Sequence, residues 1–349
     1  MHFFDDSLLP EHQEKLIIQV APYGPQWLPA DSDDIPVTMD EQVQKAVDCW
    51  NAGATVLHVH VREDDGKGSK RLTKFNEMLA RLREAVPQMI LQVGGSISFA
   101  PEDETQSAKW LNDDTRHMLA ELTPAPDQVT IAINTSQMNV MELMTEADVA
   151  GTSLTNPALQ AAYRDMIVPS NPSWHVEHLR RLVAHGIQPH FMLGNLTQLE
   201  TVERLIRRGA YTGPLVLNYV AIGGGAAGLH PADMIEFARR TPDGAVLTIE
   251  TLNRNVVPLN TMAIAMGLHV RVGIEDTLFG PDGKRATSVQ QVEKMVRIAR
   301  ELNRDIASGA EAKRIYRIGE HWTSTEDTLA RLGMAPNRRQ DAERYRAAA

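Results

Sequence analysis

Short apolar runs rich in β-branched residues alternate with amphipathic stretches along most of the chain. Such runs predict buried strands, whereas apolar positions three or four residues apart predict helices packed on a sheet. Strands are predicted at residues 15–21, 55–61, 89–93, 128–133, 189–193, 215–222, 245–249 and 269–273. Helices are predicted at residues 39–51, 75–85, 105–122, 174–185, 196–208, 231–240, 257–266 and 288–301. Eight such βα units predict an α/β fold, a (β/α)₈ TIM barrel.

The chain offers no sign of a second domain. No linker rich in Pro, Gly or Ser divides it, so we expect a single barrel domain at residues 1–319. A C-terminal extension at residues 320–349 is expected to form a subunit contact. Residues 134–174 have no clear period, and a long irregular stretch inside a compact domain is usually functional or involved in contacts.

Composition and charge narrow the class of protein. Of the 349 residues 43% are hydrophobic, which excludes a disordered chain, and the formal charge is −10, which argues against a nucleic-acid partner. The short basic stretch at residues 337–346 also carries Asp341 and Glu343. No run reaches the ~18 apolar residues of a membrane helix. With a single cysteine, Cys49, expected to be a small buried hydrophobe, a soluble cytoplasmic protein is predicted.

The strongest chemical signal is the stretch LHVHVR at residues 57–62. Side chains alternate along a strand, so His58 and His60 share one face at the strand's carboxyl end. Two imidazoles placed there suit a divalent metal, commonly zinc. Two hydrogen-bonded core histidines are the structural alternative.

A third ligand is predicted from the last strand. If the strand stays extended, Arg271 and Glu275 point the same way, and Asp276 begins the next loop. Strands two and eight can converge above the barrel mouth, so Glu275 could join the histidine pair and leave positions open for catalysis. The alternative is a plain ion-pair network, which is costly when buried without a metal or substrate.

Two glycine-containing loops are further candidates. Gly94 and Gly95 allow close backbone approach, and Ser96 offers a hydroxyl and an amide to a substrate oxygen. The loop after the first strand, with Gln26 and its neighbour tryptophan, could shape a pocket. All of these could equally be ordinary turns.

The stretch GGGAAG at residues 223–228 fits a dinucleotide-binding pattern, with Glu250 ending the next strand. However, the following helix does not open from the glycines, and the unit is sixth rather than first, so no nicotinamide cofactor is predicted. A loop lining the barrel mouth is the preferred interpretation. The remaining histidines, His175, His178, His185 and His190, are interpreted as structural or surface residues.

Several stretches resemble the β-keto acid cleavage enzymes, whose named member is 3-keto-5-aminohexanoate cleavage enzyme. They are KLIIQVAPYG, AGATVLHVHVRE, DDGKGS, QVGGS, RVGIED and VEKMVRIARELNRDIASGAEAKRIYRIG. Together they follow the chain from residue 15 to 319, and the blocks HVHVR and RVGIED, in this order, are its specific features.

The resemblance implies a zinc-containing (β/α)₈ barrel that forms a homo-oligomer, a tetramer or a dimer. It implies an acyltransferase that condenses a β-keto acid with acetyl-CoA to give acetoacetate and a new acyl-CoA. By this resemblance His58, His60 and Glu275 hold Zn²⁺. Ser96, Arg271 and Asp276 take substrate-binding and catalytic positions.

The chain departs from the named member in the loop after the first strand. That enzyme has a glutamate for a substrate amino group, and this chain has Gln26, which argues against an amino-substituted substrate. Gln26, with Gly94 and Gly95, is predicted to contact the substrate. Two alternatives stay open: a zinc hydrolase of the amidohydrolase type, and a metal-binding barrel without activity.

Overall fold

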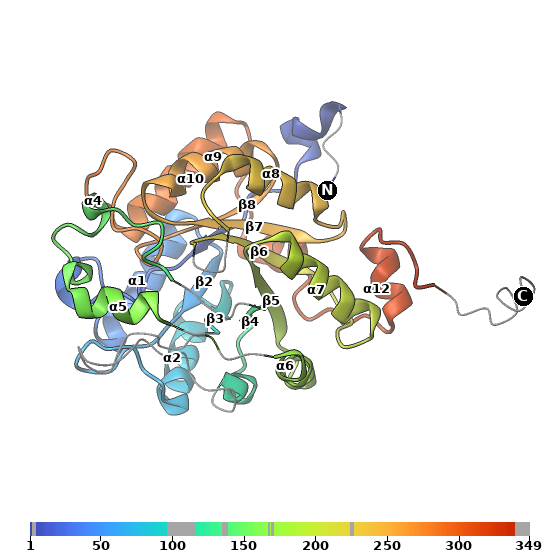
Figure 1. Ribbon diagram of the computed structural model, residues 1–349, viewed down its shortest axis with the longest axis horizontal. Helices are drawn as coiled ribbons and strands as arrows, with labels where there is room; N and C mark the ends of the chain where they lie inside the picture. The colour runs from blue at the N-terminus through green and yellow to red at the C-terminus, as the bar shows by residue number, and fades with distance from the viewer. Residues whose placement is uncertain are drawn as a thin grey trace, which may run out of the picture.

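The computed structural model describes residues 1, 5–95, 116–134, 139–166, 168, 171–223 and 227–338. Its strands run parallel and pair in chain order, and β1 also pairs with β8, which closes a barrel (Figure 1). The strands are β1 (Ile18–Val20), β2 (Val56–Val59), β3 (Ile90–Val93), β4 (Gln128–Ala132), β5 (Gln188–Leu193), β6 (Val216–Ala221), β7 (Val246–Thr251) and β8 (His269–Val272). The predicted (β/α)₈ barrel is confirmed.

Helices lie around the barrel, and most of them bury one face against it (Figure 1). They are α1 (Met39–Ala52), α2 (Leu72–Ala85), α4 (Glu146–Val149), α5 (Pro157–Arg164), α6 (Pro172–Ala184), α7 (Leu196–Arg207), α8 (Pro231–Arg240), α9 (Val256–Ala265), α10 (Ser288–Glu301), α11 (Gly309–Ile315) and α12 (Thr325–Arg331). A hydroxyl cap from Thr38 begins α1, and Gly53, at a φ of 117°, ends it. As predicted, Cys49 is buried in this helix, and burial raises the pKa of its thiol to about 12.

Several predicted elements have other bounds than predicted, and α11 and α12 were not predicted. β1 is shorter than predicted, because its ladder with β2 pairs only Gln19 and Val20. The stretch predicted as irregular contains α4, α5 and the start of α6. Thr145 and Asn156 stand at the N-caps of α4 and α5, so these short helices are defined by their caps rather than by a long apolar period. The predicted helix at residues 105–122 falls largely outside the described residues.

The barrel interior has an apolar layer and a polar layer. At the amino ends of the strands, Ile17, Val56, Ile90 and Val216 pack against Tyr316, which follows α11. Two residues further along each strand, side chains on the same inward face are polar and buried. They include Gln19, His58, Gln92, Asn218 and Arg271. Over the carboxyl ends lies a second apolar cluster, which includes Trp27, Leu154, Tyr163 and Leu278. The polar layer is therefore enclosed between two apolar ones.

The chain beyond residue 319 packs against its own barrel. α12 lies on α7, and Leu329 and Leu332 belong to the main apolar core. Asn337 Nδ2 donates to the backbone carbonyl of Arg207 at 2.9 Å. None of the described helices is long and apolar enough to cross a membrane.

Candidate active site

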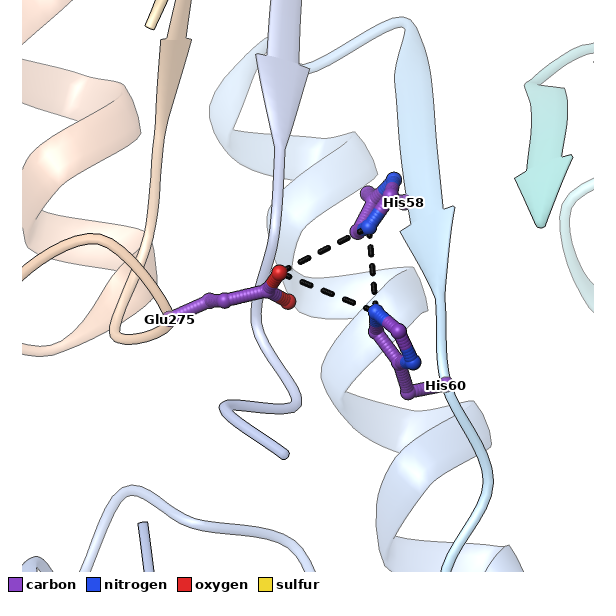
Figure 2. A group of neighbouring side chains, drawn as sticks. All are labelled: His58, His60 and Glu275. Atoms are coloured by element: carbon purple, nitrogen blue, oxygen red, sulfur yellow. Dashed lines mark hydrogen bonds and ion pairs between the residues drawn. The ribbon is translucent and has the colours of Figure 1, made fainter. Parts of the chain in front are cut away.

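The predicted histidine pair lies inside the barrel mouth. His58 is in β2 and His60 follows the end of that strand, and both rings are almost fully buried. Their Nε2 atoms lie 3.1 Å apart and face the same point (Figure 2). On the other side of its ring, His58 Nδ1 lies 2.7 Å from Gln92 Oε1. Burial and the positive charge of Arg271 lower the pKa of His58 well below its usual range, so the ring is neutral.

Glu275 reaches the histidines from the turn after β8. Its Oε1 lies 3.5 Å from His58 Nε2 and 3.7 Å from His60 Nε2 (Figure 2). The route differs from the prediction, because the strand ends at Val272 and Gly273 turns the chain with a φ of 139°. A Cβ at Gly273 would lie 2.2 Å from the carbonyl oxygen of Ala21, so only glycine allows this approach. The turn, not strand alternation, directs Glu275 to the histidines.

Arg271 lies among three carboxylates. Its Nη2 donates to Glu275 Oε1 at 2.8 Å and to Asp276 Oδ1 at 2.9 Å, and its Nη1 lies 3.4 Å from Glu250 Oε2. Burial raises the pKa of Asp276 to about 8, an effect that Arg271 opposes and Glu250 and Glu275 increase. One guanidinium faces three carboxylates, so full ionisation leaves two uncompensated negative charges in a buried cluster.

This cluster suits a divalent cation in ligand type, space and charge. Two imidazole nitrogens and a carboxylate oxygen lie within 4.8 Å of one another, a donor set that zinc accepts. A Cβ at Gly94 would lie 2.4 Å from His60 Cε1 and 3.1 Å from His58 Nε2, so the glycine keeps space open beside both rings. Two positive charges would also neutralise the excess around Arg271. The assignment of His58, His60 and Glu275 as metal ligands stays a prediction.

Of the other residues predicted to bind substrate, the structure places Gly95 and Gln26 near the cluster and does not describe Ser96. Gly95 lies beside β4, where its backbone N–H donates to Thr130 Oγ1 at 2.5 Å. Ser96 lies outside the described residues. Gln26 is buried at the site, and its Nε2 donates to the backbone carbonyl of Glu275. Its Oε1 has no hydrogen-bond partner among the described residues, which leaves a buried acceptor beside the cluster.

Three residues of the site were not predicted. Glu250 was interpreted only as part of a dinucleotide pattern, yet it lies inside the barrel against Arg271. Gln92 holds His58, and Arg62 donates to the backbone carbonyls of Tyr23 and Gly24, each at 2.6 Å. For Gln92 a local signal was present, because it lies two positions after Ile90 and therefore on the same face of its strand, whereas Arg62 lies beyond the end of its strand.

The histidines interpreted as structural or surface residues follow that description. His175, His178 and His190 are buried, and His185 is exposed on the surface. The middle of the glycine-rich loop, residues 224–226, lies outside the described residues.

Comparison with known proteins identifies the family. A family model described as beta-keto acid cleavage enzyme matches residues 15–318. The chain is 26% identical over 310 residues to the 3-keto-5-aminohexanoate cleavage enzyme of Acetoanaerobium sticklandii, which covers 88% of this chain and 100% of that protein. It is 28% identical over 322 residues to the 3,5-dioxohexanoate:acetyl-CoA acetone transferase of Paraburkholderia graminis, covering 88% of this chain and 96% of that protein.

Among solved structures, the fold is similar to the ternary complex of ObcA with a C4-CoA adduct and oxalate. The TM-score is 0.57 at 16% identity, over 81% of this chain and 67% of that chain. The similarity supports the barrel fold, and the names of the sequence relatives confirm the prediction of an acyltransferase-type enzyme. Since the family model spans most of the sequence, the chain belongs to the β-keto acid cleavage enzyme family.

Proposed function

We propose that this enzyme condenses a β-keto acid with acetyl-CoA, in a zinc-dependent reaction that yields acetoacetate and a new acyl-CoA. The observation that carries the proposal is the convergence of His58, His60 and Glu275 on one point, with Asp276 next in the chain. Acetyl-CoA as the second substrate is supported by the name of the Paraburkholderia relative.

In this proposal His58, His60 and Glu275 hold the zinc ion. Zinc bound there supplies Lewis-acid polarisation of the keto acid's oxygens, which makes the methylene between its two carbonyl carbons more acidic. The neutral imidazole of His58 and the buried carboxylate of Glu275 provide ligand forms that zinc requires.

Asp276 acts as the general base. It is 2% exposed, and Arg271 Nε and Nη2 hold its carboxylate through contacts of 2.9 to 3.2 Å, so its orientation is fixed. Asp276 takes a methylene proton, and the resulting carbanion attacks the acetyl carbonyl of acetyl-CoA. A carbon–carbon bond forms and the thioester C–S bond breaks, releasing the CoA thiolate.

The thiolate then attacks the original keto carbonyl. The bond between that carbon and the methylene carbon breaks, giving the new acyl-CoA, and Asp276 returns its proton to the carbon that becomes acetoacetate. Arg271 remains paired with the carboxylates throughout and limits charge build-up in the enclosed layer. Ser96 would stabilise the developing oxyanion, a role that rests on the family resemblance alone.

Substrate choice is proposed to depend on the loop that carries Gln26. The Oε1 atom of Gln26, which has no partner among the described residues, is free to accept a hydrogen bond from a substrate, whereas its Nε2 donates to the backbone carbonyl of Glu275. A carboxylate at this position would attract a cationic group, whereas the amide does not carry that charge. We therefore expect a neutral β-keto acid side chain rather than an ammonium-bearing one.

The proposal is tested by mass spectrometry of the products of purified, metal-assayed protein. Acetyl-CoA is supplied with β-keto acids that carry neutral, acidic, amino or quaternary-ammonium side chains. Acetoacetate together with one acyl-CoA supports the reaction and identifies the substrate class. Turnover that needs no acetyl-CoA, or no acetoacetate from any keto acid by the zinc-loaded enzyme, contradicts it. The expected homo-oligomer is checked by light scattering on the same sample.

A further inference from the structure

A continuous row of buried polar side chains connects His58 to Glu250 across the barrel. From His58 Nδ1 the distances are 2.7 Å to Gln92 Oε1 and, from Gln92 Nε2, 2.9 Å to His190 Nδ1. His190 Nε2 lies 2.9 Å from Asn218 Oδ1, and Asn218 Nδ2 lies 2.8 Å from Glu250 Oε2. All five residues are at most 5% exposed. The row therefore joins five strands, β2, β3, β5, β6 and β7, without reaching solvent.

The Glu250 end fixes the direction of every bond in the row. Glu250 Oε2 faces both Asn218 Nδ2 and Arg271 Nη1, so this oxygen accepts. Asn218 must then turn its own oxygen toward His190, whose Nε2 has to carry a hydrogen. Burial lowers the pKa of His190 to about 4, so its ring is neutral and its Nδ1 accepts. The donor is Gln92 Nε2 at 2.9 Å, which lies closer to Nδ1 than Gln128 Oε1 does at 3.2 Å. Gln92 therefore donates to His190 with Nε2.

A second row of hydrogen bonds independently fixes the orientation of the Gln92 side-chain amide. Gln188 Nε2 donates to the backbone carbonyl of Tyr316 at 2.7 Å, and a carbonyl can only accept. Gln188 Oε1 then receives Gln128 Nε2 at 2.6 Å, and Gln128 Oε1 receives Gln92 Nε2 at 3.0 Å. Both rows thus present the oxygen of Gln92 to His58.

We propose that Gln92, His190, Asn218 and Glu250 are positioning residues that keep the hydrogen of His58 on Nδ1, so that Nε2 offers its lone pair to the cation site. Gln92 Oε1 is an acceptor and lies against Nδ1, so the hydrogen has to be there. Since the residue that bonds a ligating imidazole from behind sets its tautomer and orientation, this row preorganises the site. The consequence for metal binding rests on the proposed function, whereas the tautomer of His58 does not.

The first test is made on the metal-free protein. Nitrogen-15 NMR of protein labelled at histidine distinguishes protonated from unprotonated ring nitrogens, and a His58→Asn variant identifies the His58 signals. We expect Nδ1 to be protonated and Nε2 to be bare. A His58 ring protonated mainly on Nε2 overturns the proposal, whether or not the protein binds zinc.

Two substitutions at His190 distinguish a role in positioning His58 from a role in packing the barrel interior. His190→Gln keeps one acceptor and one donor at a spacing close to that of the two imidazole nitrogens. It can therefore still donate to Asn218 and accept from Gln92. His190→Leu cannot. We expect His190→Leu to weaken zinc binding about tenfold in a chelator competition, and His190→Gln to stay within about threefold of wild type. Equal losses in the two variants would assign His190 a packing role and overturn the proposal.

Thr248→Val is the matched control. Thr248 lies in the same buried layer and shares one hydrogen bond, at 2.9 Å, with the Tyr316 hydroxyl, outside the row from His58 to Glu250. We expect its zinc affinity and the His58 signals to be those of wild type. A protein that shows the Nδ1 tautomer and binds no zinc would retain the positioning inference and refute the zinc-dependent function.

Discussion

Replacing Arg271 with methionine tests whether this side chain compensates the buried carboxylates. Methionine keeps an unbranched apolar stem but leaves Glu250, Glu275 and Asp276 without a cation. Breaking a buried ion pair costs about 3–5 kcal/mol. With an unfolding entropy of about 2.1 cal/mol/K per residue, the 349-residue chain has about 0.7 kcal/mol/K. The melting temperature of the metal-free variant should therefore fall by about 4–7 °C.

Arg304→Met is the control for this prediction. Arg304 is as buried as Arg271, but it donates to the backbone carbonyls of Glu14, Ile264, Gly267 and Leu268 rather than to carboxylates. Thermal unfolding is followed by circular dichroism with and without one equivalent of zinc. Added zinc should reduce the deficit of Arg271→Met, because two positive charges replace the lost one, and leave that of Arg304→Met unchanged. An Arg271→Met protein that melts like wild type without metal would refute the reasoning.

Three further predictions follow from the same structure. Asp276→Asn should retain stoichiometric zinc by elemental analysis but lose about 10²–10⁴-fold in kcat, and full activity would exclude Asp276 as the base. Gly273→Ala should lower stability in urea unfolding by more than Gly319→Ala, because both have positive φ but only at Gly273 would the Cβ meet backbone, 2.2 Å from the Ala21 carbonyl; equal losses would count against a steric role. Burial lowers the pKa of His178 to about 3, so its ring takes up a proton on unfolding below about pH 6.5, and stability should fall as the pH drops from 6.5 toward 3. Between pH 7 and pH 4.5 the free energy of unfolding of His178→Gln should fall by about 1–3 kcal/mol less than that of wild type. An equal fall in the two proteins, measured by urea unfolding at both pH values, would contradict this.

The fold could be predicted from the sequence because the strands of a barrel have a recognisable apolar pattern. Runs such as TVLHVHV and LVLNYVAI are mostly apolar, as expected of strands buried on both faces, and their repeated alternation with amphipathic helices is typical of a parallel barrel. Short elements were harder, since α4 has only four residues and too few positions to show a period.

The candidate site could be predicted in part. The alternation of His58 and His60 is a local property of one strand, so the sequence alone indicates their shared face. The position of Glu275 was inferred from an extended strand, whereas the turn at Gly273 directs it, and a close approach to Ala21 is visible only in three dimensions. Gln92 and Glu250 were missed because their roles depend on partners that lie on other strands, far along the chain.

The packing of α12 has a practical consequence for where this protein can be cut. The family match ends at residue 318, so truncation after that point would look harmless. Yet Gly244 faces the backbone of α12 so closely that a Cβ there would lie 2.0 Å from the Arg331 carbonyl, and Leu329 and Leu332 are fully enclosed. A shortened chain would expose this apolar seam to solvent, and we expect it to precipitate or to be degraded by proteases. A boundary for truncation, domain fusion or transfer of this barrel into a designed protein should therefore lie beyond α12 and Asn337 rather than at residue 319.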